Sequence, residues 1–343
     1  MTAAVTDPHF RLPPAPAALE PGPTPTFSVL IPAYEAAGTI GEAIDSLLRQ
    51  TVAPVEIIVC DDGSADDLTG ALARFGDRVA LIAGEHRGVA AARNRLLDAA
   101  TGQFVVPLDA DDVYAPTRLE RLGDLARARP DLDLLSTDAT FVRQGHPTGR
   151  FNEGTQFAVE NQAEAFLDRC YVICPAMRRD RLLAIGGYDD SLRTAEDWDV
   201  CLRLVLDGAT AGLVDEPLME YRLGTGSVTA DRGETLRDRL RMLEKVAASP
   251  GLDPAFRDAA EQALARHRAR ALAQAAREAV AAEDPDARAR LLAVARCRGA
   301  APRVRAGALL ASLSPRRLRR VVAATVPGSV GAHGVDQGGS RQR

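Results

Sequence analysis

The sequence predicts an α/β fold with a mostly parallel sheet flanked by helices, followed by a C-terminal all-α extension. Two observations support this: short apolar runs alternate with amphipathic stretches early in the chain, and the pattern becomes entirely helical from about Asp231. The apolar runs cover residues 27–31, 55–60, 79–82 and 104–108. Near-continuous apolar strands that alternate with helices are typical of a parallel sheet covered on both faces.

The stretches between the apolar runs have the spacing of helices. Apolar residues recur three or four positions apart, at Ile40, Ile44, Leu47 and Leu48 and again at Leu68, Leu72 and Phe75. The C-terminal helical region is rich in Ala, Arg and Leu and is interrupted near Pro250, Pro254, Pro285 and Pro302. Parallel sheets bind ligands at the carboxyl ends of their strands, so the residues that follow each strand are the candidates for chemistry.

Changes in composition divide the chain into four parts. Residues 1–25 are rich in Pro and Ala and have little to bury, so we expect a disordered leader. A catalytic domain is expected over residues 26–230 and a helical region over 231–326. The Gly-rich segment 327–343 is expected to be a disordered tail.

Composition also limits the class of protein. The chain is 46% hydrophobic and 26% charged, as in an ordinary globular protein, and its net charge of -5 argues against a nucleic-acid partner. No apolar run approaches the roughly 18 residues that span a bilayer, and the N-terminus lacks a secretory signal. The five cysteines have neither metal-ligand nor disulfide spacing, so we expect a cytoplasmic protein. A location at the inner face of the membrane is also compatible with the sequence.

Acidic residues follow three of the predicted strands. The chain reads IPAYE at 31–35, CDDGS at 60–64 and PLDADD at 107–112. Carboxylates crowded at one edge of a sheet repel one another unless a cation or hydrogen-bond donors balance them. A divalent metal ion that also grips phosphate oxygens provides that balance, because Mg²⁺ is usually bound by one or two carboxylates plus substrate phosphates.

Each acidic segment also has a purely structural interpretation. The DDGS segment could be a turn in which Ser64 caps the next helix and Asp67 completes a capping box. The DADD segment could be a polar loop before the helix that Pro116 opens. Both interpretations are compatible with a ligand role for the same residues.

A further acidic segment begins a helix later in the chain. Trp198, Cys201, Leu202 and Val205 fall on one helical face, which predicts a helix with a buried side. We expect Asp199 and Arg203 to form an ion pair one turn apart. Asp197 could simply be an acid that interacts favourably with the helix dipole at the start of the helix. The set of motifs described next implies a further role for it.

Taken together, the motifs between about residues 27 and 221 resemble those of family 2 glycosyltransferases of the GT-A type, whose Rossmann-like, mostly parallel sheet has flanking helices. The motifs that carry the resemblance are SVLIPAY (28–34), IIVCDDGS (57–64), GVAAARN (88–94), LDADD (108–112), GGYDD (186–190), EDWD (196–199) and LMEYR (218–222). Their order and spacing are specific to the family.

The resemblance implies a role for each site residue. Pro32, Tyr34 and Glu35 would line the nucleobase pocket, with Asp62 accepting a hydrogen bond from the base, which favours uridine. Asp109 and Ala110 would face the ribose or donor sugar, and Arg93 would contact the diphosphate. Asp111 would bind Mn²⁺ or Mg²⁺ in this DXD-type motif, with Asp112 beside it. Asp197 would be the catalytic base and Glu196 would hold the acceptor or orient that base.

The resemblance also implies the reaction. A hexosyltransferase of this type moves a sugar from a nucleotide-diphosphate donor to the hydroxyl of a glycan, lipid-linked or small-molecule acceptor, as in polysaccharide biosynthesis, and inverts the anomeric centre in a single displacement. The metal offsets the charge that develops on the leaving diphosphate. Members often carry a histidine shortly after the last motif, but residues 223–227, which follow Tyr221-Arg222, contain none. Arg222 or the Gly-rich backbone there could serve instead, or the metal could be held more weakly. His86 lies near the site but is expected to be a surface residue.

Other functions fit less well. The segment after the first strand matches neither GxGxxG nor GxxxxGK[ST], which argues against a nicotinamide oxidoreductase or a kinase. A nucleotidyltransferase-like enzyme or a catalytically inactive nucleotide-sugar-binding module are the alternatives. The basic, Leu-containing segment 303–322 could contact an anionic membrane, or it could be a solvated cap that packs on the catalytic domain or forms a homodimer.

Overall fold

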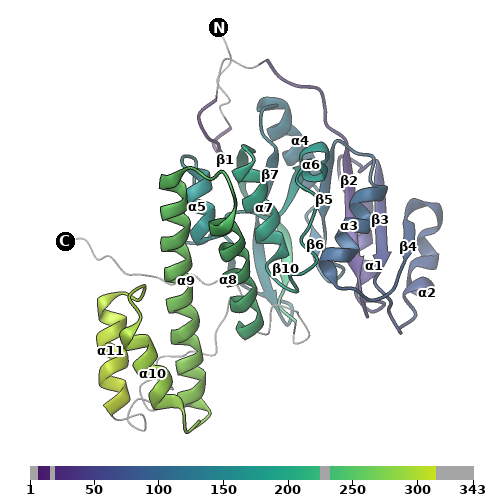
Figure 1. The fold of residues 1–343 in the computed structure, drawn as a ribbon. Coiled ribbons are helices and arrows are strands. Elements are labelled where there is room, and N and C mark those ends of the chain that lie inside the picture. Colours follow the sequence, from purple (N-terminus) through teal and green to yellow (C-terminus); the bar gives the residue numbers. More distant parts are fainter. Residues whose placement is uncertain (1–6, 16–19, 225–231, 314–343) are drawn as a thin grey trace. The chain divides into compact units, whose positions relative to one another are not determined.

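The structure is a computed structural model that describes residues 7–15, 20–224 and 232–313 (Figure 1). The chain forms two compact units, Met1–Ser227 and Val228–Arg343. The first unit holds a single mixed sheet with flanking helices, and the second is helical. This is the predicted fold class, which is thereby confirmed.

The sheet of the first unit has ten strands, eight of which follow one another in the order β1-β10-β7-β9-β5-β2-β3-β4. β6 pairs with β10 and β8 pairs with β7. The strands are β1 (Phe10–Arg11), β2 (Phe27–Ala33), β3 (Glu56–Asp61), β4 (Ala80–Ala83), β5 (Phe104–Pro107), β6 (Val113–Tyr114), β7 (Leu134–Arg143), β8 (His146–Arg150), β9 (Ile173–Arg178) and β10 (Ala211–Arg222). The four predicted apolar runs thus form β2, β3, β4 and β5, to within two residues at each end.

The strand directions determine where the polar strand ends meet. β2 runs parallel to both β3 and β5, and β4 runs parallel to β3. β9 is antiparallel to β5 and to β7, so β7 and its parallel partner β10 run in the direction of β2. The carboxyl ends of β2, β3, β5 and β10 therefore lie at the same edge of the sheet.

Alternate residues of the central strand β2 are buried against different helices. Phe27, Val29 and Ile31 belong to a core cluster that also contains the apolar faces of α1, α2 and α4. Leu30 is equally buried but lies outside that cluster, on the side where α3 packs against β2 and β3. Both faces of the parallel part are thus covered, which explains the continuous apolar runs.

The helices of the first unit connect the strands. They are α1 (Ile40–Leu48), α2 (Leu68–Leu72), the 3₁₀ helix η1 (Ala73–Arg78), α3 (Val89–Ala99), α4 (Arg118–Ala128), α5 (Gln162–Asp168), α6 (Arg179–Ala184) and α7 (Glu196–Leu206). In α7 the predicted buried face is present: the Trp198 indole donates to the Phe166 carbonyl at 2.7 Å. The expected ion pair between Arg203 and Asp199 is also formed, at 2.7 Å.

Part of the expected disordered leader has a defined structure. Phe10 and Arg11 form β1, which pairs antiparallel with β10 at the edge of the sheet. Arg11 binds Asp215 at 2.8 Å, and Asp7 binds Arg121 on α4 at 2.7 Å. The prediction of disorder is wrong for these residues because an apolar side chain and two charged ones find partners on β10 and α4 that lie far away in the sequence.

Prolines mark the helix boundaries of the second unit, as the sequence predicted. α8 (Arg232–Ala248) ends before Pro250, and α9 (Pro254–Ala281) begins with a proline after Asp253 caps its first turn. α10 (Ala287–Arg296) follows Pro285, and α11 (Pro302–Leu313) again begins with a proline. The predicted basic segment 303–322 is described only as far as residue 313, and the predicted tail 327–343 lies outside the described residues.

Candidate active site

Three acidic residues follow β5 at the carboxyl edge of the sheet. Asp112 is almost completely buried, at 1% exposure, and its Oδ1 accepts a hydrogen bond from the backbone N–H of Arg222 at 2.8 Å. Its Oδ2 is also buried and has no hydrogen-bond partner among the residues that the structure describes. Burial raises the pKa of Asp112 well above its usual range, and the neighbouring carboxylates of Asp109 and Asp111 raise it further. The pKa of Asp111 is raised for the same reasons, burial first and Asp109 second.

Arg93 on α3 joins this acidic cluster to helix α7. Its guanidinium is 5% exposed and donates to Asp109 at 2.8 Å and to Glu196 at 2.5 Å. Burial by itself would lower the pKa of Arg93, but the two carboxylates raise that pKa well above its ordinary value. Arg93 is therefore a charged bridge between the end of β5 and the start of α7.

Glu196 is the buried acid at the start of α7. Burial raises the pKa of Glu196 to about 7; the Arg93 cation opposes this shift and the charge of Asp197 adds to it. Glu196 thus exchanges a proton near neutral pH, although it lies against a cation.

Asp197, the next residue, is exposed, whereas Glu196 is buried. The helix begins after Ala195, whose backbone has a positive φ of 62°. Positive φ values are uncommon for residues other than glycine and concentrate at functional sites. Glu35 (φ 51°) and Cys174 (φ 41°) share this feature near the ends of β2 and β9.

Tyr221 on β10 lies within electrostatic reach of both acidic groups. Burial raises its pKa well above the usual range, and the charges of Asp109, Asp112 and Asp197 raise it further. Both groups of acids therefore contribute to the electrostatic surroundings of this half-buried phenol. The ion pairs of Arg93 with Asp109 and Glu196 link the same two groups.

A second part of the site lies after β2 and β3. The ring of Tyr34, which is half exposed, stacks on the ring of His86 with centroids 4.1 Å apart. The buried carboxylate of Asp62 accepts from the backbone N–H groups of Arg87 (3.0 Å) and Gly88 (2.7 Å) and binds Arg95 (3.2 Å). The loop between β4 and α3 is therefore fastened to the end of β3.

The loops after β2 and β3 are fastened to each other as well. The Glu35 carboxylate accepts from the backbone N–H of Ala65 at 2.7 Å, and the N–H of Glu35 donates to the hydroxyl of Ser64 at 3.0 Å. Asp67 alone caps α2, by accepting from the N–H of Gly70. The predicted capping box is therefore not formed: Asp67 is itself the N-cap of α2, and Ser64 connects the two loops.

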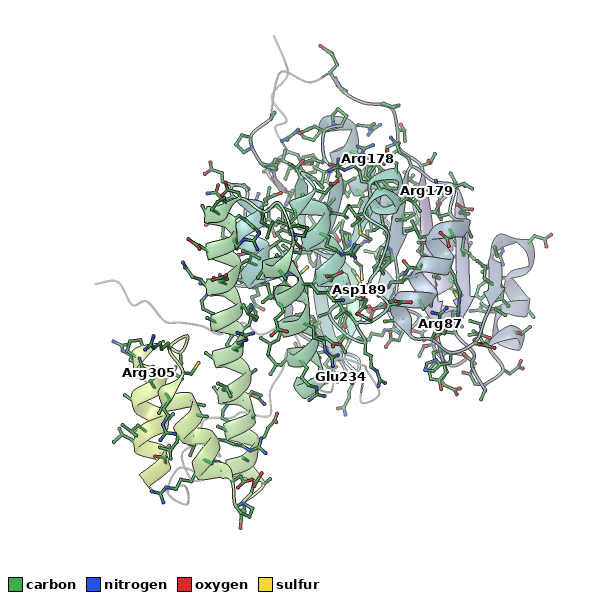
Figure 2. All side chains as sticks on the ribbon, in the orientation of Figure 1. Arg87, Arg178, Arg179, Asp189, Glu234 and Arg305 are labelled. Carbon is green, nitrogen blue, oxygen red and sulfur yellow. The ribbon has the colours of Figure 1, made fainter. Side chains whose placement is uncertain are left out.

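Figure 2 shows the orientation of this edge. Arg87, on the loop before α3, lies toward one end of the sheet. Arg178, the last residue of the antiparallel strand β9, and Arg179, the first of α6, lie toward the other. The acidic residues after β2, β3 and β5 share the Arg87 end, because these strands run parallel.

Residues 28–184 match the family model described as Glycosyl transferase family 2. This match covers slightly less than half of the chain and includes the strands from β2 to β9. The chain is 26% identical over 226 residues to the Escherichia coli UDP-Glc:alpha-D-GlcNAc-diphosphoundecaprenol beta-1,3-glucosyltransferase WfgD. The aligned region covers 65% of this chain and 87% of the relative. The matched family and this relative are glycosyltransferases, which identifies the protein as a transferase of glycosyl groups and argues against the nucleotidyltransferase-like alternative.

Solved structures show the same GT-A fold. Mannosyltransferase PcManGT from Pyrobaculum calidifontis, in complex with GDP-Man and Mn²⁺, superposes with a TM-score of 0.58 at 23% identity, covering 90% of this glycosyltransferase and 87% of PcManGT. Residues 1–349 of TarS from S. aureus, in complex with UDP, superpose with a TM-score of 0.58 at 19% identity, covering 87% of this chain and 90% of that one.

The structure brings most of the sequence-predicted site residues of the glycosyltransferase to one edge. Pro32 is buried within β2, and Ala110 is buried between the acids that follow β5. Arg93 forms ion pairs with two carboxylates of the chain itself, and the diphosphate contact predicted for it stays a prediction. The base contact predicted for Asp62 and the catalytic role predicted for Asp197 stay predictions.

Two contacts at the site were not predicted from the sequence. The backbone N–H of Arg222 fixes Asp112, while the Arg222 side chain binds Glu42 on α1 at 2.6 Å. His86 is exposed, as the sequence predicted, and it also stacks on Tyr34. Both residues lie close in sequence to the site motifs, but spacing along the chain does not indicate these two contacts.

The residues present fit a divalent metal. Among the described residues no three His, Cys, Asp or Glu side chains form a ready-made metal cage. The unpartnered Oδ2 of Asp112 and the raised pKa of Asp111 are nevertheless what is expected of carboxylates that lack their balancing cation. Two carboxylates plus substrate phosphates form an ordinary Mg²⁺ site, so such a metal would complete its coordination through the donor.

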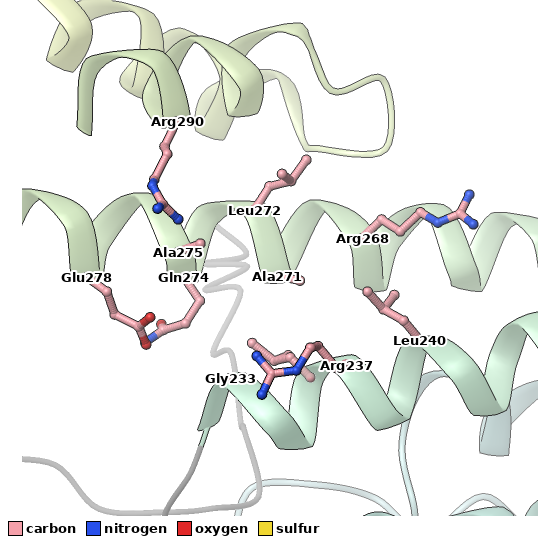
Figure 3. A pocket seen from close by; sticks show the side chains of 11 residues that line it. Gly233, Arg237, Leu240, Arg268, Ala271, Leu272, Gln274, Ala275, Glu278 and Arg290 are labelled. Atoms are coloured by element: carbon pink, nitrogen blue, oxygen red, sulfur yellow. The ribbon is translucent and has the colours of Figure 1, made fainter. Parts of the chain in front are cut away.

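A separate hollow lies within the helical unit. It is bordered by α8, α9 and Arg290 of α10, and its lining combines arginines with leucines, including Arg237, Arg268, Leu240 and Leu272 (Figure 3). It contains none of the carboxylates described above. None of the helices in the described part of the chain is both long and apolar enough to cross a bilayer.

Proposed function

We propose that this glycosyltransferase transfers a hexose from a nucleotide-diphosphate donor, a UDP-sugar, to an acceptor hydroxyl with inversion of the anomeric centre. The observation that carries the proposal is the connected set of charges that runs from Asp112 and Asp109 through Arg93 to Glu196 and Asp197. It joins a place for the donor diphosphate to an exposed acid suited to activate the acceptor.

The metal and the diphosphate belong at the acids that follow β5. Asp111 and Asp112 would hold Mn²⁺ or Mg²⁺, and the metal would offset negative charge on the leaving diphosphate. The PcManGT structure, of the same fold, contains Mn²⁺ and GDP-Man. Asp109, which binds Arg93, would face the ribose or the donor sugar, with Ala110 beside it. Tyr34, Pro32 and Glu35 with Asp62 would line the nucleobase site.

The acceptor is activated from α7. Asp197 is exposed at the helix start and would take the proton of the acceptor hydroxyl as its oxygen attacks the anomeric carbon. Attack from the side opposite the leaving diphosphate inverts the configuration and requires no covalent intermediate on the enzyme. Glu196, fixed by Arg93, would position Asp197 and keep negative charge beside it above neutral pH.

A lipid-linked glycan is the acceptor class we propose, in polysaccharide biosynthesis. The relative WfgD acts, by its name, on a diphosphoundecaprenol-linked sugar. Helix α11 exposes Val304, Leu309 and Leu310 together with Arg303 and Arg305, a combination suited to an anionic membrane surface. Flotation with anionic liposomes at low salt tests this part, and absence of binding contradicts it.

Transfer assays test the reaction. UDP-, GDP- and TDP-hexoses are supplied with Mn²⁺ and a diphosphoprenyl-linked sugar acceptor, and release of nucleoside diphosphate is measured with and without EDTA. We expect Asp111→Ala and Asp197→Asn each to lower kcat by about 10²–10⁴-fold. Asp98→Asn, an exposed residue of α3, is the matched control. Metal-independent activity, a retained anomeric configuration by NMR, or full activity of Asp197→Asn would contradict the mechanism.

A further inference from the structure

The side chain of His86 contacts both residues that the proposed function assigns to nucleobase binding, Tyr34 and Asp62. The imidazole of His86 stacks on the exposed ring of Tyr34 with a centroid distance of 4.1 Å and an interplanar angle of 29°. Its Nδ1 lies 3.0 Å from Oδ2 of Asp62 and 3.0 Å from the backbone carbonyl oxygen of the same residue. A flat ring thus meets an aromatic face and a carboxylate at once.

The backbone of His86 is held firmly while its side chain is not enclosed. A Cβ on Gly63 would lie only 2.7 Å from the backbone nitrogen of His86, so the two loops are in direct contact. The neighbouring N–H groups of Arg87 and Gly88 donate to Asp62. The His86 side chain is 55% exposed, so it can rotate into solvent without moving the loop.

A nucleobase offers the same two interactions as this imidazole. Aromatic faces attract flat heterocycles, and a carboxylate such as that of Asp62 can accept a further N–H besides those it already binds. Uracil, thymine and guanine carry a ring N–H beside a flat face, whereas adenine and cytosine in a nucleotide do not. Uracil can therefore replace imidazole at both contacts.

We propose that the imidazole of His86 occupies the nucleobase site when no nucleotide is bound, by contacting Tyr34 and Asp62. A nucleotide whose base carries a ring N–H then displaces it. This inference rests on the proposed function, because it takes the Tyr34 and Asp62 pair as the base site. His86 then lowers affinity for every nucleotide and most strongly for bases without a ring N–H, which cannot replace its contact with Asp62.

Nucleotide binding measured by calorimetry tests the inference. The probes are UDP, GDP and TDP, each with Mn²⁺, and ADP serves as the base without a ring N–H. His86→Ala removes the competitor, and we expect its Kd for UDP to fall about five- to tenfold, the value of one aromatic contact plus one hydrogen bond. His86→Phe keeps the stacking and loses the N–H, so its Kd should lie between wild type and His86→Ala. Glu85→Gln, exposed on the same loop, should leave the Kd unchanged.

A second readout follows the ring itself. In NMR spectra, the imidazole C–H signals that are missing from His86→Ala should shift when UDP is added to the wild type, because the ring leaves the face of Tyr34. Unfolding followed by the fluorescence of Trp198 verifies that each variant is folded. Together these measurements separate displacement of His86 from a general effect of substitution.

The outcomes distinguish this inference from the function on which it rests. If wild type binds UDP and turns over a UDP-sugar, but His86→Ala binds UDP equally or more weakly, the inference is wrong and the proposed function stands. If no variant binds any of the nucleotides, the proposed function fails and the inference fails with it. Tighter binding by His86→Ala together with the UDP-induced shift supports the inference.

Discussion

Replacing Arg93 by methionine removes the cation that joins the two sides of the site. Arg93 is 5% exposed and donates to Glu196 and Asp109, so the variant leaves two carboxylates in a poorly hydrated place without their partner. Methionine has a similar length and an apolar stem, so lost charge dominates over lost volume. Removal of one partner from a buried ion pair typically costs about 3–5 kcal/mol of unfolding free energy.

The cost should depend on pH because Glu196 titrates near neutrality. The pKa of Glu196 is about 7 in the presence of Arg93, raised from its ordinary value, so the folded protein holds this proton below pH 7 and loses that stabilisation as pH rises through 7. Without the Arg93 cation the pKa rises further and the folded variant keeps the proton above pH 7. Each pH unit then costs about 1.4 kcal/mol, so the penalty at pH 8.5 should exceed that at pH 6 by up to about 2 kcal/mol.

Urea unfolding followed by fluorescence measures this penalty. Trp198 is the only tryptophan of the chain and is buried in α7, two residues from Glu196, so its emission reports on the catalytic unit. The matched control is Arg87→Met, whose pair with Asp190 is exposed and 3.4 Å long; we expect a cost below about 1 kcal/mol. The double variant Arg93→Met, Glu196→Gln should lose at least about 1 kcal/mol less than the sum of its single variants.

Three results would refute this reasoning. The first is an equal cost for Arg93→Met and Arg87→Met. The second is a penalty for Arg93→Met that does not change between pH 6 and 8.5. The third is strict additivity with Glu196→Gln, since that would mean that the guanidinium and the carboxylate contribute to stability independently.

Three further predictions follow from the site. The initial rate of the wild type should rise as pH increases through about 7, where Glu196 loses its proton, and Glu196→Gln should lack this rise; an unchanged profile would assign the titration elsewhere. Gly63→Ala should lower the free energy of unfolding in urea by about 2 kcal/mol or more, because φ is +80° and the new Cβ would lie 2.7 Å from the backbone nitrogen of His86. Gly145→Ala, where φ is +77° but the space is open, should lower it less. Asp112→Asn should raise the Mn²⁺ concentration that gives half the maximal rate by at least about tenfold, whereas Asp98→Asn should leave it unchanged. The same concentration for Asp112→Asn and the wild type would exclude Asp112 from metal binding.

Local patterns in the sequence were sufficient to predict several strands, the helix breaks and the edge of the sheet at which the site lies. Apolar runs and turn residues predicted β2, β3, β4 and β5, and the prolines predicted the breaks between α8, α9, α10 and α11. The disordered leader was mispredicted at Phe10 and Arg11, whose strand depends on a partner about 200 residues away in β10. A pattern in 25 residues of leader contains no information about that partner.

The sequence by itself determined the α/β class, the helical extension and the gathering of carboxylates at one edge, because periodicity and strand direction are local properties of the chain. Only the tertiary structure decided which charges meet. Arg93 and Glu196 are 103 positions apart, and Asp112 and Arg222 are 110 apart. Whether a carboxylate is bridged, unpartnered or covered by a histidine ring depends on burial and on distances between such remote residues, and spacing along the chain does not encode these directly.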